Sequence, residues 1–327
     1  MAIKIVIKPK SPGYALAVVK NDQILYRELA GLANLDSRIP INQNVTFRLA
    51  SLSKQFTAMA IMILKERKLL DYDDQLSKFS PDFPNYGDKV TICQLLSHTS
   101  GMPDHEQPLY WELKRNPRLV PNIYDSLRVL KQQKQLLFPA GIKFQYSDSG
   151  YVLLALIIEK VSGLSYRDFL ANNIFKPLNM NNSDVLDDTK PKIDNRAYGY
   201  RTLKNGFKLF DFDPLNYIVG DEGVYSSIDD MVKWNQAWTK PVLVSQKTLR
   251  QAFNPQRLLN GKIGKAGFSW LITNYRKEKI IYQDGCWVGF RNIILKIPKK
   301  NATVIILSNR TDLKTSQQRI AAVFDLC

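Results

Sequence analysis

Hydrophobic and polar positions near both ends of the chain follow a pattern that predicts β-strands. Residues 14–20 and 23–29 are strand-like, and Asn21 and Asp22 between them are typical of a tight hairpin turn. After residue 267 the same character returns in four segments, 268–273, 280–282, 288–297 and 302–307. Apolar residues and lysines alternate over residues 1–8, which indicates a further short strand rather than a signal peptide.

The middle of the chain shows helical periodicity instead. An apolar run follows Ser51 to about residue 68, and a strongly apolar helix over 152–161 is expected to stop at Gly163. Thr91 and Ser227 are suitable N-caps for two more helices. Further helices are expected at 123–133, 166–173 and 316–324, loops at 31–44, 102–120 and 180–220, and a turn at 221–227.

Strands at both ends with helices between them indicate an α/β (α+β) fold. We expect one antiparallel sheet built from both chain ends, flanked by helices, with an all-helical region inserted. The sequence shows no internal repeat or low-complexity segment. We therefore predict a single domain over residues 1–327, with an α/β part at about 1–55 and 262–327 and a helical part at about 56–261.

Composition narrows the functional classes. The 327 residues include three cysteines, far apart, and only two histidines, so we expect no disulfide framework, no metal site and no His-dependent triad. The net charge of +16 is scattered and comes with no nucleic-acid motif. We interpret it as a solvated basic surface, with electrostatic association to anionic cell-envelope polymers as the alternative. No apolar stretch is long enough for a membrane span, and the missing signal peptide favours a cytoplasmic location.

The candidate chemistry centres on Ser51 and Lys54 in the sequence RLASLSKQF. In a helix, a spacing of three residues puts both side chains on one face. A hydroxyl near a helix N-terminus, beside an amine that relays its proton, is a workable nucleophile. Roughly one or two Ser-x-x-Lys matches arise by chance in a chain of this length, so the motif alone is weak. The simpler alternative is a capping serine and a solvated lysine.

Four further segments follow in order, and together the five resemble the serine β-lactamase-related hydrolases, a family that includes penicillin-binding proteins, DD-peptidases and esterases. The resemblance covers about residues 14–325 and implies the same α/β plus all-helical layout. It rests on SLSK with its flanks (47–57), LLSHTSGM (95–102), FQYSDSGY (144–151), GDEGVYSS (220–227) and QDGCWVGF (283–290).

The resemblance also implies roles for individual residues. Ser51 would be the acylated nucleophile, Lys54 its proton partner, and Tyr146 the second proton-transfer group. The backbone N–H groups of Ser51 and Cys286 would form the oxyanion hole, and Gly285 would allow a close backbone approach. Which of Lys54 and Tyr146 takes the serine proton stays open. A phenol is a poor base alone, but a nearby ammonium stabilises its phenolate.

Two substrate-binding positions depart from the family pattern. Gln283 stands where the family usually has lysine or histidine, so a cation that would bind a substrate carboxylate is missing. Asp148 stands where the family usually has asparagine, and a carboxylate close to Lys54 would hold that lysine charged. Both changes make β-lactam hydrolysis a less favoured activity. His98 is expected to fix a loop rather than act as a base.

The leading hypothesis is therefore a serine hydrolase that acts on esters or amides, such as D-peptides, through a Ser51 acyl-enzyme. It needs no cofactor, and its partner is a small-molecule or peptide substrate. The alternative is a weakened or inactive penicillin-binding-like protein that binds a peptide or small ligand. A third reading is a basic protein that acts mainly on anionic envelope polymers. The family often works outside the cytoplasm, so the resemblance favours a periplasmic or extracellular location.

Overall fold

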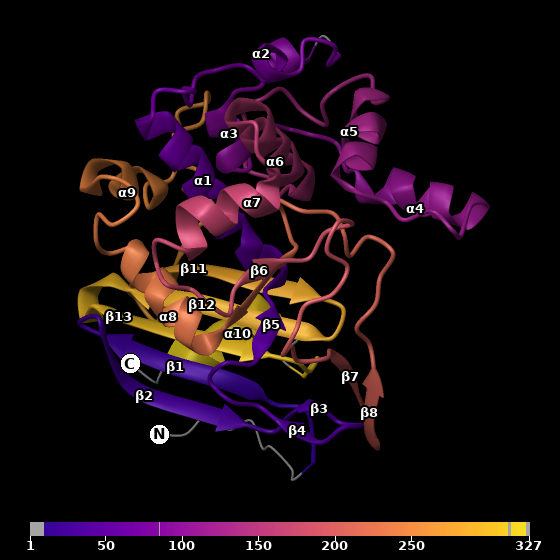
Figure 1. Cartoon of the computed structure of the whole chain (residues 1–327). Coiled ribbons are helices and arrows are strands. Elements are labelled where there is room, and N and C mark those ends of the chain that lie inside the picture. Colours follow the sequence, from indigo (N-terminus) through magenta and orange to yellow (C-terminus); the bar gives the residue numbers. More distant parts are fainter. Residues whose placement is uncertain (1–9, 85, 313–314, 325–327) are drawn as a thin grey trace.

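The computed structural model describes residues 10–84, 86–312 and 315–324 (Figure 1). The strand expected over residues 1–8 lies outside these residues. The described helices include none that is long and apolar enough to cross a membrane.

A six-stranded antiparallel sheet is built from both ends of the chain, as the sequence predicts. Its spatial order is β10-β11-β12-β13-β1-β2. The C-terminal strand β13 pairs with the N-terminal strand β1 from Tyr14 opposite Ser308 to Lys20 opposite Ala302. The strands are β1 (Tyr14–Lys20), β2 (Gln23–Ala30), β10 (Leu271–Tyr275), β11 (Glu278–Trp287), β12 (Phe290–Ile297) and β13 (Ala302–Ser308).

The turn between β1 and β2 confirms the hairpin prediction. Asn21 and Asp22 have φ values of +52° and +63°, the left-handed conformation that a two-residue hairpin of this hand requires. Asparagine and aspartate tolerate that conformation better than most residues. The local sequence therefore specifies the connection and the register of the first two strands.

Both faces of the sheet are covered, which explains why β1 is almost continuously apolar. Leu16 and Val18 face a cluster with the C-terminal helix α10 (Ser316–Phe324). Ala15 and Ala17 face the main core, to which α1 (Lys54–Glu66) and α8 (Ile228–Ala237) contribute. A strand buried on both faces loses the polar alternation of a half-exposed strand.

The helical region lies on one side of the sheet and packs around α6 (Asp148–Ser162) (Figure 1). Thr91 caps α3 through a reciprocal capping box with Gln94, and Gly163 ends α6 in the left-handed conformation. The remaining helices are α2 (Leu76–Phe79), α3 (Ile92–Leu96), α4 (Glu106–Arg115), α5 (Ile123–Lys131), α6 (Asp148–Ser162), α7 (Tyr166–Leu170) and α9 (Gln246–Ala252).

Several sequence-based boundaries are wrong. The expected loop at 102–120 contains α4, because Pro108 lies in its first turn, where a missing N–H breaks no intrahelical bond. Helix α6 begins at Asp148, four residues before the expected start, and α9 was not predicted. The stretches taken as loop or turn also contain short strands: β3 (Leu32–Asn34), β4 (Ile39–Pro40), β6 (Asp184–Val185), β7 (Tyr200–Leu203), β8 (Gly206–Leu209) and β9 (Val224–Ser227).

The segment around Ser51 also differs from the single helical turn that the sequence suggests. Arg48 belongs to a strand, β5 (Thr46–Arg48), which pairs with β9. A short 3-10 turn, η1 (Ala50–Ser53), then leads into α1. This strand pairing fixes the chain immediately before the candidate nucleophile.

Candidate active site

Ser51 lies at a sharp change in chain direction. Ala50, just before it, has a φ of +52°, a left-handed conformation that alanine rarely adopts. Asn292 of β12 is fully buried and donates hydrogen bonds to the carbonyl oxygens of Arg48 (2.9 Å) and Leu49 (3.1 Å). A strained residue persists only where its surroundings hold it. The sheet therefore fixes the position of the Ser51 hydroxyl.

Lys54 points toward Ser51 from the first turn of α1. Its Nζ atom lies 3.2 Å from the Ser51 Oγ, 2.6 Å from Asp148 Oδ1 and 3.0 Å from the backbone oxygen of Asp221. The Lys54 side chain is completely buried, so its three donors are matched by these three acceptors. The structure thus brings together residues that lie up to 167 positions apart.

The charges around Lys54 keep it protonated. Burial alone would lower the pKa of the Lys54 ammonium, but the negative charges of Asp148 and other neighbours outweigh burial and raise this pKa well above its ordinary value. Burial would raise the pKa of Asp148, yet the Lys54 charge holds it below its ordinary value. At neutral pH the two groups form an ammonium–carboxylate pair. A lysine held in this state is a weak base.

The Tyr146 side chain lies beside Ser51 and Lys54, and 36% of the residue is exposed. Gln283 Nε2 donates to the hydroxyl over 3.2 Å, and Lys54 Nζ lies 5.1 Å from the ring centroid. Desolvation raises the pKa of Tyr146 to about 12, against the lowering effects of the Lys54 charge and of interactions with the Ser51 and Lys54 side chains. The phenol is thus close to both groups that the proposed chemistry needs.

His98 holds the loop that carries Tyr146. The two rings stack with centroids 4.4 Å apart, and His98 Nδ1 accepts the N–H of Ser147 over 3.1 Å. Burial lowers the pKa of His98 to about 3, so the imidazole is neutral. These contacts are those of a loop-fixing histidine.

The edge of β11 forms the opposite wall. Beyond Tyr282 this strand extends past β10, so its edge is available to η1. Gln283 is completely buried and also donates to the Ser51 carbonyl oxygen over 3.3 Å. A Cβ atom at Gly285 would lie 2.1 Å from the Leu49 oxygen, so this close approach requires glycine. Cys286 follows with an exposed thiol.

Sequence reasoning missed two contributors to this site, Asn292 and Asp221. Asn292 carried no motif, because an asparagine within an apolar strand gives no signal of what it will contact. Asp221 lay in a family-like segment without an assigned role, yet its backbone oxygen binds Lys54. Asp284 follows Gln283 but points to the other face of the sheet, where it pairs with Arg319 and Ser316.

A cluster of ionisable groups adjoins the Lys54 side of the site. His105, Glu106 and Asp221 each place a nitrogen or carboxylate oxygen within 4.8 Å of the others. Burial raises the pKa of Glu106 to about 8 and that of Asp221 to about 7, and it lowers the pKa of His105 to about 4. The sequence contains only two histidines, which argues against a metal site. Among the described residues, His105, Glu106 and Asp221 are nevertheless the group that could hold a metal ion.

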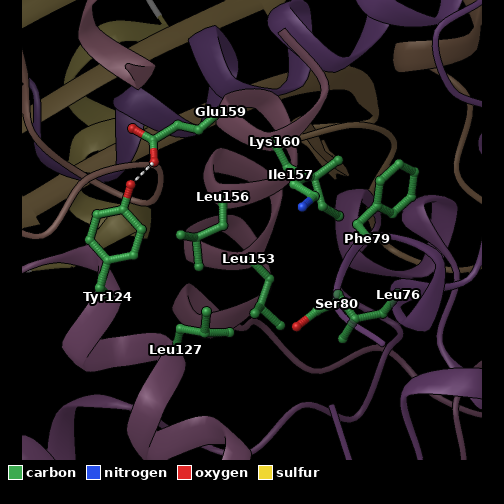
Figure 2. Close-up of a pocket in the computed structure, with 10 residues that line it drawn as sticks. All are labelled: Leu76, Phe79, Ser80, Tyr124, Leu127, Leu153, Leu156, Ile157, Glu159 and Lys160. Atoms are coloured by element: carbon green, nitrogen blue, oxygen red, sulfur yellow. Dashed lines mark hydrogen bonds between the residues drawn. The ribbon is translucent and has the colours of Figure 1, made fainter. Parts of the chain in front are cut away.

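A separate apolar hollow of about 300 Å³ lies between α2, α5 and α6 (Figure 2). Leu153, Leu156 and Ile157 of α6 line it, and the Tyr124 hydroxyl donates to Glu159 Oε2 over 2.8 Å at its side. None of the candidate catalytic residues contributes to its lining. We therefore assign the chemistry to the Ser51 pocket.

The fold and this pocket define a class of protein. A serine three residues before a buried lysine, beside the edge of an antiparallel sheet and facing a tyrosine from the helical region, is the Ser-x-x-Lys arrangement of β-lactamases and penicillin-binding proteins. A family model described as Beta-lactamase matches residues 4–326. The chain belongs to the β-lactamase family, and with it to a class of serine hydrolases in general.

Individual relatives agree with this assignment. The chain is 35% identical to penicillin-binding protein 4* of Bacillus subtilis, over 94% of this chain and 70% of the relative. It is 28% identical to protein flp of Staphylococcus aureus, over 91% of this chain, and spans 59% of that longer protein.

Two solved structures have the same fold. An octameric penicillin-binding protein homologue from Pyrococcus abyssi superposes with a TM-score of 0.80 and 27% identity, over 97% of this chain and 74% of the other. A penicillin-binding protein from Bacillus halodurans superposes with a TM-score of 0.79 and 26% identity, over 97% of this chain and 96% of the other.

Proposed function

We propose that this protein hydrolyses ester or amide bonds through an acyl-enzyme on Ser51. The observation that carries the proposal is the 3.2 Å contact between Ser51 Oγ and Lys54 Nζ, with the Tyr146 phenol in the same pocket. A nucleophile and its proton partners within hydrogen-bonding reach are the geometric requirement for covalent catalysis.

The proposed reaction has two steps. The Ser51 oxygen attacks the substrate carbonyl while its proton passes to the phenolate form of Tyr146. The positive charge of Lys54 favours this form, against the desolvation that raises the pKa of the phenol to about 12. We assign the base to Tyr146 because Asp148 holds the proton on Lys54. The proton then moves to the departing alcohol or amine, which leaves an ester on Ser51. Water attacks this ester by the reverse proton path and releases the acid.

The N–H groups of Ser51 and Cys286 are the proposed donors to the carbonyl oxygen that becomes negative. A donor of this kind is worth about 3 kcal/mol in the transition state. The neutral side chain of Gln283 removes the cation that would attract a substrate carboxylate. We therefore favour esters and peptides over β-lactam antibiotics as substrates.

Covalent labelling tests the proposal. A fluorophosphonate probe should label the wild-type chain on the peptide that contains Ser51, as detected by mass spectrometry. Ser51→Ala should lose both the label and the turnover of p-nitrophenyl esters, while Ser37→Ala, an exposed serine, should keep both. Labelling of a different residue, or equal esterase activity in the Ser51→Ala variant, would refute it.

A second function is favoured by the Lys54–Asp148 pair. If this ion pair keeps the site from deprotonating the water that attacks the acyl-enzyme, the chain would bind or trap a substrate without turnover. Penicillin would then acylate Ser51, and the adduct would persist for hours in the mass spectrum. Release of the adduct within minutes favours the hydrolase instead.

A further inference from the structure

The start of α4 and the loop before β9 line a small cavity. Its polar lining residues are His105, Glu106, Asp221 and Glu222, and the remaining lining residues are Leu215, Ile218 and Trp287. His105 is 1% exposed and Asp221 3% exposed, whereas Glu106 is half-buried and provides the access to solvent. The nearest ligand-type atoms of His105, Glu106 and Asp221 lie within 4.8 Å of one another.

Asp221 contributes a buried carboxylate to this cavity. Its Oδ1 atom is buried and has no hydrogen-bond partner among the residues that the structure describes. A buried carboxylate oxygen without a partner is costly, because it has lost water and gained nothing in return. Lys54 binds only the backbone oxygen of Asp221, and its remaining donors go to Asp148 and Ser51.

The size of the cavity limits which molecule or ion could bind the Asp221 carboxylate. The space open to the centre of a water-sized sphere is about 10 Å³. This is room for roughly one water or one ion. A substrate amine with its attached carbon chain does not fit without a rearrangement.

The ligand chemistry then selects a metal. His105 Nδ1 is 3.1 Å from Ser149 Oγ, a contact that orients the ring. One imidazole nitrogen and two carboxylate oxygens suit zinc better than magnesium or calcium. Zinc bonds of about 2.0–2.2 Å put tetrahedral ligand atoms about 3.4 Å apart, so ligand atoms within 4.8 Å of one another need to approach by up to about 1.4 Å. We propose that His105, Glu106 and Asp221 bind one divalent transition-metal ion, with Zn²⁺ as the expected occupant.

The bound ion would connect the two segments that line the cavity. Glu106 is the first residue of α4 and His105 precedes it, whereas Asp221 lies in a loop and its backbone oxygen accepts from Lys54. A metal on the Asp221 carboxylate would therefore fix this loop and steady the position of Lys54. The proposal does not depend on hydrolysis by Ser51, and its test uses no measurement of activity.

Direct titration tests the site. The full chain, prepared without a polyhistidine tag and freed of metal with a chelator, should bind one Zn²⁺ per chain in calorimetry. Co²⁺ should give visible absorption bands that Zn²⁺ displaces. Zn²⁺ should also raise the melting temperature, because it binds only the folded state. Glu106→Gln and Asp221→Asn should each weaken Zn²⁺ binding by at least about tenfold.

Asp104→Asn is the matched control. Asp104 is exposed and sits next to His105. Its Oδ1 accepts the N–H of Glu106 and its Oδ2 accepts that of Gln107, and asparagine keeps one of these two acceptor oxygens. The charge of Asp104 acts on His105 and Glu106 only from outside the ligand set, so this variant should lose far less Zn²⁺ affinity than Glu106→Gln. No saturable binding of Zn²⁺ or Co²⁺ to the folded wild-type chain would overturn the proposal. Equal affinities in wild type, Glu106→Gln and Asp221→Asn would overturn it as well, because the metal would then lie elsewhere. Glu106→Gln keeps the test valid if Asp221→Asn fails to fold.

Discussion

Replacing Asp148 by asparagine keeps the shape of the side chain and removes the charge that holds Lys54 protonated. The Asp148 Oδ1 and Lys54 Nζ atoms lie 2.6 Å apart. At an effective dielectric constant of about 20, two unit charges at this separation attract with about 6 kcal/mol. The Asp148 side chain is 34% exposed. Solvent screening therefore reduces the effect to about 1–3 kcal/mol, or about one to two pKa units.

Both candidate bases respond to this change in the same direction. Loss of the negative charge makes the Lys54 ammonium less stable and the Tyr146 phenolate more stable, so the pKa of either group falls. The reaction needs the deprotonated base, so its rate increases with pH through that pKa. The rising limb of kcat/KM should therefore move to lower pH by about one to two units, and kcat/KM at neutral pH should increase by about tenfold or more.

The assay is kcat/KM for a p-nitrophenyl ester, measured from about pH 6 to about pH 10. Asp194→Asn, the same change at an exposed aspartate, should leave the profile unchanged. A melting curve should accompany each variant, because the substitution leaves the buried Lys54 with less countercharge. In a folded Asp148→Asn variant, a rising limb of kcat/KM at the wild-type pH, or a lower kcat/KM at neutral pH, would refute the reasoning. Either result would show that the Asp148 carboxylate does not raise the pKa of the catalytic base.

Three other substitutions test separate parts of the structure. Burial lowers the pKa of Lys296 to about 7. The unfolded chain therefore binds more protons between about pH 7 and pH 10, and stability should fall as pH decreases through that window by up to about 1.4 kcal/mol per unit. Lys296→Met should remove this dependence in urea unfolding, and an unchanged slope would contradict it. Gly285→Ala brings a methyl group against the Leu49 oxygen and should reduce kcat/KM by about 100-fold or more, equivalent to roughly 3 kcal/mol; near wild-type activity would rule out this close contact. Gln283→Lys should lower KM for substrates with a carboxylate by about fivefold relative to neutral analogues, equivalent to about 1 kcal/mol, and an equal KM ratio would refute a binding role there.

The local parts of the fold could be predicted because short-range chemistry decides them. Asn21 and Asp22 specify a hairpin by their own conformational preferences, and Thr91 with Gln94 specifies a helix start. The short strand β9 could not be predicted in this way. It forms because Ser227 pairs with Thr46, which is far away in the sequence, and the local sequence of either segment does not indicate this pairing. Pro108 is one reason why a loop was expected where α4 lies, since proline breaks helices except in the first turn.

The same division applies to the site. By itself the sequence determined the Ser51–Lys54 pair, because a spacing of three residues suffices to put both groups on one helical face. It also identified Asp148 and Gln283 as chemically unusual at their positions. Only the tertiary structure decided that Asp148 touches Lys54 and that the Asp221 carboxylate lies near His105 and Glu106. Those contacts join segments that meet only when the helical region closes on the sheet, and the burial that sets their charge states exists only in the packed chain.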